Sequence, residues 1–416
     1  MRRARIACEA RAAEGEEVYG FERIGLIAAL LGGCVVSEPE VHIRSEVKGA
    51  AEMHDDAGSS VDAAPPTIDE PHACSAGACW WSARVEGCES AGVPLPSARP
   101  TQAAGEPSLP AVHLGLSRLS FASPLNTQRD TQSWRTFGFD LDGVCTGSSG
   151  CARADATACR SRAPTPDGLM CRDNGLARLL GDPAARVWDE DAINCALHRG
   201  STTLILRVSE YSGQLDDAEV RLDVYASPGL QNQPPWDCGA PAARDNYPRW
   251  RATVPFTVDA ASLGGAGATP GSLPDAKQFD AAAYVKDGYL VARLAERATL
   301  ALYPGASFFL TIEGGVLTGR LSLERSGVWS LRDGLIGGRV RRDALLQSMA
   351  RAGLCADDPR YAAVSTSLER SLDVLADGSS DPERDCDALS FAFAFEADAL
   401  TPGNEVSVAA ESSCPR

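Results

Sequence analysis

The chain has 416 residues, 44% of them hydrophobic, so it is long enough to bury a sizeable core. Its formal net charge of −17 argues against nucleic acid or an anionic membrane surface as a partner. Its 14 cysteines are more than a cytosolic protein of this length needs, and they indicate a disulfide-bonded protein of an oxidising compartment.

An apolar run at residues 24–36 is the first element along the chain. Its 13 residues are fewer than the roughly 20 that a membrane-spanning helix needs, and they suit the core of a signal peptide. The segment Leu31-Gly32-Gly33-Cys34 resembles the lipobox of bacterial lipoproteins, whose cysteine takes the lipid. We therefore predict a signal peptide over 1–33, lipidation of Cys34 and a lipid-anchored location in the cell envelope, at the outer membrane or cell surface. The alternative is a buried strand or helix of a cytosolic protein.

An acidic segment follows the predicted lipid site. Residues 35–72 hold nine acidic and two basic residues with little apolar periodicity, which predicts a disordered, flexible tether. Three cysteines next to it, Cys74, Cys79 and Cys88, form a small cluster. Disulfide bonding suits this cluster better than zinc, because the paired CxxC spacing of structural zinc sites is missing. We assign 34–107 to the tether with its cysteine cluster.

From residue 108 onward the pattern is that of an antiparallel β protein. Apolar residues alternate over 112–121, 204–208, 220–224 and 388–397, and 289–331 predicts a meander split at Pro304-Gly305, Gly314-Gly315 and Ser326-Gly327. Helical spacing occurs at 341–352 and 359–376. We predict an all-β, disulfide-stabilised antiparallel β-sandwich over 108–416 with a short helical insert. Two β domains that split within 259–282 are the alternative.

Several stretches of this region look familiar as a set. "FGFDLDGVCT", "DGLMCRDNGL", "LILRVSEYSGQLDDAEVRLDVYAS", "AYVKDGYLVARL", "GVWSLRDGLIGGR" and "CDALSFAFAFEA" together resemble a group of uncharacterised predicted surface lipoproteins of myxobacteria, over about residues 137–397. The resemblance implies a surface or secreted location, and it implies no particular activity.

An aspartate cluster is the strongest candidate for chemistry. Gly-rich loops carry Asp140, Asp142, Asp167 and Asp173, with Asn174 beside them. Carboxylate oxygens in flexible loops are the ligands that calcium prefers, so these residues predict a calcium site. The spacing is not that of an EF-hand, since Cys151 occupies position 12 counted from Asp140. The alternative is that the carboxylates hold turns together through backbone amides.

Aromatic side chains in the Pro-rich loop 232–250 are candidates for ligand binding. Trp236, Tyr247 and Trp250 could stack on sugar rings, or they could pack in the core. No familiar catalytic motif is present, so we favour a binding or adhesion module, with a surface glycan or an envelope protein as partner and calcium as the one candidate cofactor. A carboxylate-based polysaccharide hydrolase and a structural envelope component are the alternatives.

Overall fold

The computed structural model describes residues 84–85, 88–89, 99–101, 107–121, 133–147, 157–163, 166–168, 171–180, 188–230, 250, 254–265, 267–302, 308–325, 327–408 and 414. All described residues lie within 69–416, the second of the two units into which the chain divides. The predicted signal peptide, Cys34, the acidic segment 35–72, Trp236 and Tyr247 lie outside the described residues.

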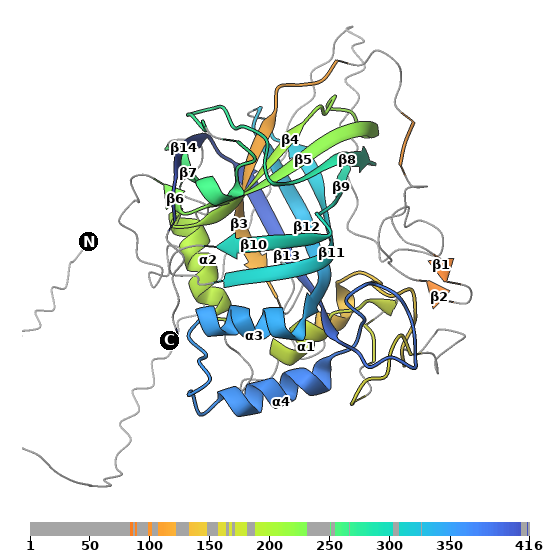
Figure 1. Ribbon diagram of the computed structural model, residues 1–416. Helices are drawn as coiled ribbons and strands as arrows, with labels where there is room; N and C mark the ends of the chain where they lie inside the picture. Colours follow the sequence, from red (N-terminus) through yellow and green to blue (C-terminus); the bar gives the residue numbers. More distant parts are fainter. Residues whose placement is uncertain are drawn as a thin grey trace, which may run out of the picture. The chain divides into compact units, whose positions relative to one another are not determined.

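Nine strands form the main antiparallel sheet (Figure 1). In spatial order they are β10 (Arg297–Leu302), β11 (Phe308–Leu323), β12 (Trp329–Arg341), β13 (Ala388–Ala399), β3 (Val112–Ser120), β4 (Thr203–Ser209), β5 (Asp217–Ser227), β8 (Gln278–Lys286) and β9 (Tyr289–Arg293). Because β9 also pairs with β11, the sheet closes on itself. The prediction of an all-β, disulfide-stabilised antiparallel fold is confirmed, and the two facing layers of the predicted sandwich belong to one continuous sheet.

Alternating apolar side chains fill the interior of the closed sheet. The predicted hairpin forms with Leu206 opposite Val224 and Val208 opposite Leu222, and all four side chains are buried. In β13 the odd-numbered Leu389, Phe391, Phe393 and Phe395 join the same core. The alternation that the sequence shows therefore decides which side chains point inward.

A second, smaller core covers the outside of β4 and β5. A three-stranded sheet of β6 (Gly229–Leu230), β7 (Phe256–Asp259) and β14 (Pro402–Val406) forms it together with Ile205, Tyr225 and Trp250. The segment 259–282 thus connects β7 of this small sheet to β8 of the main sheet. The strand β5 precedes this segment in the chain, and β8 follows it. Because these two strands pair with each other, the segment does not separate two β domains.

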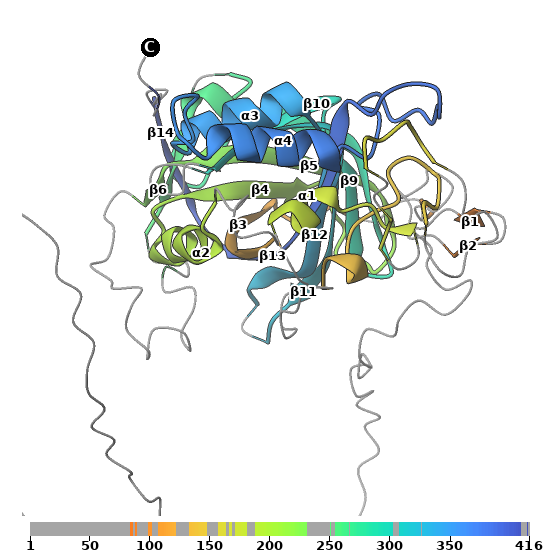
Figure 2. The ribbon, with the colours of Figure 1, turned by 90° about the horizontal axis from the view of Figure 1, so that it is seen from below.

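The helices α1 (Gly175–Leu180), α3 (Arg342–Arg351) and α4 (Tyr361–Ser371) lie together at the end of the main sheet where β12 ends and β13 begins (Figure 1). The predicted helical insert is confirmed as α3 and α4, which lie side by side when seen from below (Figure 2). The sequence did not predict α1 or α2 (Glu190–Arg199). Yet α2 has clear end signals, with Asp189 accepting amide hydrogen bonds at its start and Gly200 in a left-handed conformation (φ 68°) at its end.

Other short elements complete the described chain. They are the two-residue strands β1 (Arg84–Val85) and β2 (Cys88–Glu89), which pair with each other, and the 3-10 turns Ser133–Thr136 and Ala260–Ser262. Arg99 precedes the predicted domain start at 108, but its guanidinium donates to the carbonyl oxygens of Ala218 (2.7 Å) and Ala283 (3.2 Å). The chain before residue 108 therefore already contacts the main sheet.

One predicted break in the meander is wrong. Gly314 and Gly315 lie inside the 16-residue strand β11, at an irregularity in its pairing with β12. Gly314 has a positive φ (57°), and a Cβ there would collide with the guanidinium of Arg339. The glycines therefore allow a bulge and a close approach of Arg339, rather than a turn between two strands.

Disulfide bonds tie distant parts of this fold together. Cys145 pairs with Cys171, Cys159 with Cys386 and Cys355 with Cys414, and Cys195 is disulfide-bonded as well. The bond between Cys159 and Cys386 closes a separation of 227 residues. These bonds are consistent with a location outside the cytoplasm, where disulfides persist.

Candidate metal centre

Two loop regions form the candidate site, one at residues 139–146 and the other at 166–168 and 171–174. The backbone amide of Asp173 donates to the carbonyl of Phe139 (2.8 Å), and that of Asp167 donates to the carbonyl of Thr146 (2.9 Å). The disulfide between Cys145 and Cys171 fixes the loops at a second level. Backbone hydrogen bonds and a disulfide thus hold the two loops side by side, independently of their carboxylates.

Three of the four predicted ligands come together. Carboxylate oxygens of Asp140, Asp142 and Asp173 all lie within 4.8 Å of one another. Asp140 and Asp173 are only 4% and 2% exposed, and Asp142 is half-buried. Oxygen atoms at this spacing can hold a metal ion, so the expectation of an aspartate cluster is met at the level of geometry.

Asp167 lies at the edge of the same cluster. It is 7% exposed, and its carboxylate accepts a hydrogen bond from the amide of Thr146. Its carboxyl group is close enough to that of Asp173 to share a hydrogen bond when one of the two is protonated. Asn174, in contrast, bonds to the backbone: its side-chain oxygen accepts from the amides of Ala177 (3.4 Å) and Ala392 (3.0 Å). Asn174 therefore joins α1 to β13.

Backbone amides hold each carboxylate in place. Asp140 Oδ1 accepts from the amide of Gly143 (2.6 Å), and Asp142 Oδ1 accepts from the amide of Val144 (2.8 Å). Asp173 Oδ2 accepts from the amide of Leu141 (2.6 Å). These are the turn-stabilising bonds of the alternative interpretation, and they also orient the carboxylates toward one another. The two interpretations are therefore compatible.

The environment of the cluster raises the pKa values of its carboxyl groups. Burial, and after it the nearby charge of Asp140, raises the pKa of Asp142 to about 8. Burial is also the main reason why the pKa of Asp167 is raised to about 8. Burial, together with the charges of Asp142 and Asp167, raises the pKa of Asp173 well above its usual value. Without a cation, protons must neutralise part of this cluster near neutral pH.

A fifth aspartate, Asp373, contributes to this repulsion from a distant part of the sequence. Its charge raises the pKa values of Asp142, Asp167 and Asp173. The amide and hydroxyl of Ser390 donate to its two carboxylate oxygens. Burial raises its own pKa to about 6. No sequence signal connects Asp373 to the loops, because about 200 residues separate them.

Arg339 brings a positive charge close to the cluster. Arg339 directs its guanidinium at carbonyl oxygens, donating to Leu141 (3.0 Å) and Ala376 (3.2 Å). Its charge lowers the pKa of Asp142, but by less than burial and the charge of Asp140 raise it.

Beside the loops, a cavity of about 220 Å³ is lined by Thr146, Cys159 and Asp373, among others.

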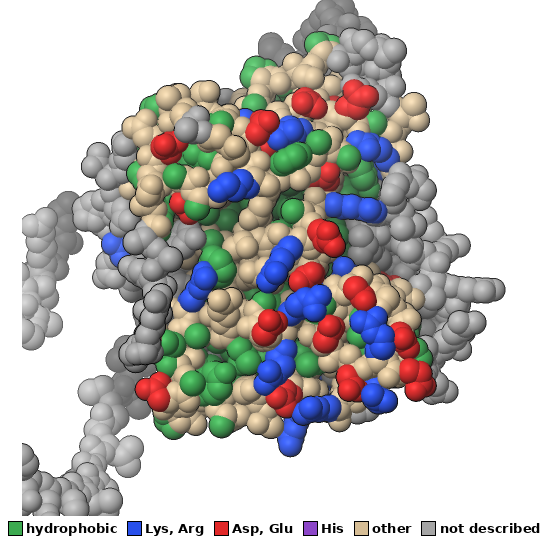
Figure 3. Space-filling view, viewed as in Figure 1, with side chains coloured by type: hydrophobic (Ala, Val, Ile, Leu, Met, Phe, Trp, Pro, Cys, Tyr) green, Lys and Arg blue, Asp and Glu red, His purple; other side chains and the backbone are tan. Residues whose placement is uncertain are grey.

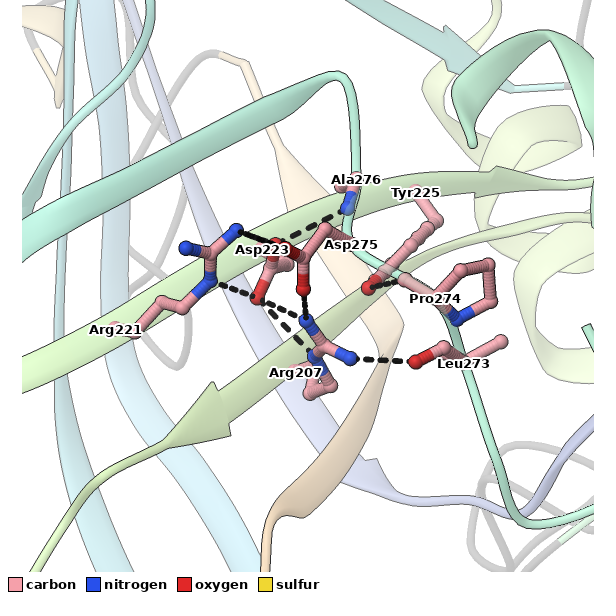
Figure 4. Close-up of polar contacts among 8 residues, drawn as sticks. All are labelled: Arg207, Arg221, Asp223, Tyr225, Leu273, Pro274, Asp275 and Ala276. Atoms are coloured by element: carbon pink, nitrogen blue, oxygen red, sulfur yellow. Dashed lines mark hydrogen bonds and ion pairs between the residues drawn. The ribbon is translucent and has the colours of Figure 1, made fainter. Parts of the chain in front are cut away.

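Asp223, a buried carboxylate of the main sheet, has a different environment from the cluster (Figure 4). Asp223 on β5 is fully buried and lies between Arg207 and Arg221, each of which donates to it at 2.8–3.1 Å. Burial alone would raise the pKa of Asp223, but the bonds from Arg221 and Arg207 lower it below its usual value. Asp275, on the segment before β8, completes the group by pairing with Arg207 (2.9 Å).

Trp250 is a core residue. It is 2% exposed, its indole nitrogen donates to the carbonyl of Leu197 (2.8 Å), and its ring packs edge-on against Phe256 at 4.8 Å. These contacts correct the expectation that Trp250 stacks on a ligand, because neither face of the ring is open. The other two aromatic candidates, Trp236 and Tyr247, lie outside the described residues.

Comparison with known proteins yields no family model, no curated protein and no solved structure that matches this chain. Among the described residues, no helix is both long and apolar enough to span a membrane.

Proposed function

We propose that this protein is a lipid-anchored, extracytoplasmic binding module whose aspartate cluster of Asp140, Asp142 and Asp173 holds a calcium ion. The observation that supports the proposal best is the convergence of Asp140, Asp142 and Asp173 within 4.8 Å of one another. A divalent cation at that point would replace the protons that the cluster otherwise needs and remove the repulsion between its carboxylates.

The donor set favours calcium over other metals. Carboxylates are hard oxygen ligands, which suit calcium and magnesium rather than zinc or copper. The cysteines nearest to the cluster, Cys145 and Cys171, are bonded to each other and so present no thiolate. Calcium tolerates the irregular geometry of loops better than magnesium, which demands a near-octahedral set of ligands.

Two features support the location. The disulfides suit an oxidising compartment, and Leu31-Gly32-Gly33-Cys34 has the order of residues that lipid attachment requires. We expect mass spectrometry of the protein from bacterial membranes to find a lipid-modified Cys34 at the mature N-terminus. Exchange of this residue (Cys34→Ser) should release the protein from the membrane fraction. An unmodified N-terminal segment in that fraction would contradict the anchor.

The hydrolase alternative fits the cluster less well. A glycosidase needs two carboxyl groups that a sugar can reach, whereas Asp140, Asp167 and Asp173 are at most 7% exposed. Turnover of a polysaccharide, abolished by Asp142→Asn, would nevertheless favour the hydrolase. Envelope defects on deletion, without any ligand, would favour the structural role.

Thermal and urea unfolding with and without calcium tests the proposed ion. A ligand at 100 times its Kd adds about 2.7 kcal/mol to the free energy of unfolding. We expect a gain of this order for the native chain and none for Asp142→Asn. The matched control is Asp259→Asn, since Asp259 is more buried than Asp142 (3% exposed) and its carboxylate likewise accepts an amide hydrogen bond, from Ala261. Asp259→Asn should retain the calcium response, and a native chain that gains nothing from calcium would refute the ion site.

A further inference from the structure

A second pocket lies away from the aspartate cluster, where the start of α3, the end of α4 and the loop at 160–162 meet. Its volume is about 280 Å³. Three arginines line it, Arg160, Arg162 and Arg342, together with two acidic residues, Glu369 and Asp385, and one leucine, Leu372. The pocket therefore has more positive than negative side chains, whereas the chain as a whole has a net charge of −17.

The pocket has a fixed frame. The disulfide between Cys159 and Cys386 joins its two sides, and Cys386 itself lines it. The backbone of Arg160 adds two hydrogen bonds, from its amide to the carbonyl of Arg384 (2.7 Å) and from the amide of Cys386 to its carbonyl (3.2 Å). The amide of Arg342 in turn donates to the carbonyl of Asp387 (3.4 Å). Covalent and backbone contacts thus fix the segments that carry Arg160 and Arg342, so the pocket is preorganised.

Ion pairs hold the guanidinium groups in the pocket without consuming all their donors. Arg160 pairs with Asp385 (2.6 Å), while Arg162 (2.6 Å) and Arg342 (2.7 Å) both pair with Glu369. The three cations and two carboxylates leave one positive charge. A guanidinium has five N–H groups in a planar fork, and Nε of Arg342 is buried without a hydrogen-bond partner in the described part of the chain.

Figure 3 shows this region as an area where arginine and acidic side chains interleave, around the C-terminal end of α4 and the neighbouring loops. The side chains of Arg160 and Arg162 are 60% and 72% exposed, so a ligand from solvent can reach them. Leu372 and Cys386 give the pocket an apolar wall beside the charges. This combination suits a ligand with an anionic group on a carbon framework.

We propose that this pocket binds an oxyanion, a carboxylate, sulfate or phosphate group, through the guanidinium groups of Arg160, Arg162 and Arg342. Planar guanidinium groups match the geometry of such anions and hydrogen-bond to them in pairs. The anion can come from an acidic glycan, which carries uronate or sulfate groups, or from a free inorganic ion. The glycan source rests on the binding function proposed above, whereas the oxyanion site itself does not.

Isothermal titration calorimetry on the calcium-free full chain at low ionic strength tests the site, because salt screens exposed charges. The probes are sodium sulfate, sodium phosphate and an oligoglucuronate. The double variant Arg160→Ser, Arg162→Ser should weaken binding at least tenfold. The matched control is Arg360→Ser, since Arg360 is 63% exposed and pairs with Asp358 at 2.7 Å but lies outside the pocket. This control should change the Kd by less than twofold.

A second variant should change affinity in the opposite direction. Asp385→Asn removes a negative charge from the pocket and releases Arg160, and Asp385 is 77% exposed, so the fold should tolerate the change. We expect the Kd to fall about threefold. Tighter binding of oligoglucuronate than of the inorganic anions would identify a glycan as the source, and the reverse order a free ion. No binding of any probe at millimolar concentration, or equal losses in the double variant and the control, would overturn the proposal. Since calcium is not added, failure of the calcium site leaves this result unaffected.

Discussion

Asp223 and the aspartate cluster both bury carboxylates, but the two regions neutralise them differently. Asp223 lies between two arginines whose side chains are 12% and 17% exposed, and its pKa is lowered. Asp142 and Asp173 face other aspartates and backbone amides, and their pKa values are raised. One carboxylate is stable as an anion in the protein alone, whereas the others need a proton or a cation.

The difference shows why the number of buried acids does not by itself identify a binding site. In Figure 4 the arginines and Asp223 satisfy one another and fix the segment that ends at Ala276, whose amide donates to Asp223 (3.1 Å). That group is structural and complete. In the aspartate cluster, backbone amides donate to the carboxylates of Asp140, Asp142 and Asp173, and the pKa values of Asp142 and Asp173 are raised, so this is the region to which we assign a ligand.

The largest expected effect is the loss of Asp223. Asp223→Asn leaves two poorly solvated arginines with only the exposed carboxylate of Asp275 as counter-charge, and we expect the free energy of unfolding to fall by about 3 kcal/mol. Urea unfolding with an unchanged m-value measures this loss. A decrease below about 1 kcal/mol would show that the pair behaves like an exposed ion pair and would remove the basis of the comparison.

The pH dependence of stability should have opposite signs in the two regions. Asp142 and Asp167 have pKa values of about 8 in the folded chain against 3.8 when unfolded, so the folded state binds protons more tightly. Without calcium the free energy of unfolding should therefore fall as the pH rises from about 4 to 8, and each tenfold difference in proton affinity between the folded and unfolded states contributes about 1.4 kcal/mol. Asp223 has a lowered pKa, and its contribution is lost only when the pH falls below its unfolded value of 3.8.

Unfolding in urea at pH 5, 6, 7 and 8 measures this slope, and saturating calcium should flatten it because the cation replaces the protons. Asp142→Asn should flatten it as well, since one titrating group is gone. A slope that is identical in the native chain and the variant would contradict the assignment to the cluster.

A smaller effect is expected from Asp142→Asn at pH 8 without calcium. Removal of one charge relieves repulsion from Asp140 and Asp373, so we expect a gain of about 0.5–1 kcal/mol rather than a loss. The same substitution should become unfavourable once calcium is added. Differential scanning fluorimetry with both calcium-free and calcium-loaded samples distinguishes the two signs, and a loss in both conditions would mean that the Asp142 carboxylate has a structural role like that of Asp223.

The smallest effect is expected at the exposed edge of the arginine group. Asp275 pairs with Arg207 (2.9 Å) and Arg221 (3.5 Å), but its side chain is 70% exposed. Asp275→Asn should therefore cost less than about 0.5 kcal/mol, as exposed ion pairs do. A double-mutant cycle with Arg207→Gln measures the coupling, and a coupling energy above about 1 kcal/mol would show that Asp275 is a full member of the buried group.

The local parts of the fold were predictable from the sequence. Alternation identified the hairpin of β4 and β5 and the buried face of β13, and helical spacing identified α3 and α4, because each pattern is contained in a short segment. Closure of the sheet depends on the pairing of Leu317 with Ala292 and its neighbours, which no local pattern expresses. The helix α2 was missed although its end signals are present, since only Ile193, Ala196 and Leu197 of its residues are buried.

The sequence by itself determined the chemical types at the candidate sites: aspartates in Gly-rich loops, an excess of cysteines and an alternating apolar pattern that makes the fold all-β. Tertiary structure decided which of these residues meet. It brought Asp373 to the loops at 139–173, placed Arg207 and Arg221 beside Asp223, and buried Trp250. The physical reason is that burial and neighbouring charges determine whether a carboxylate is an anion or a candidate ligand, and both depend on contacts between residues far apart in the chain.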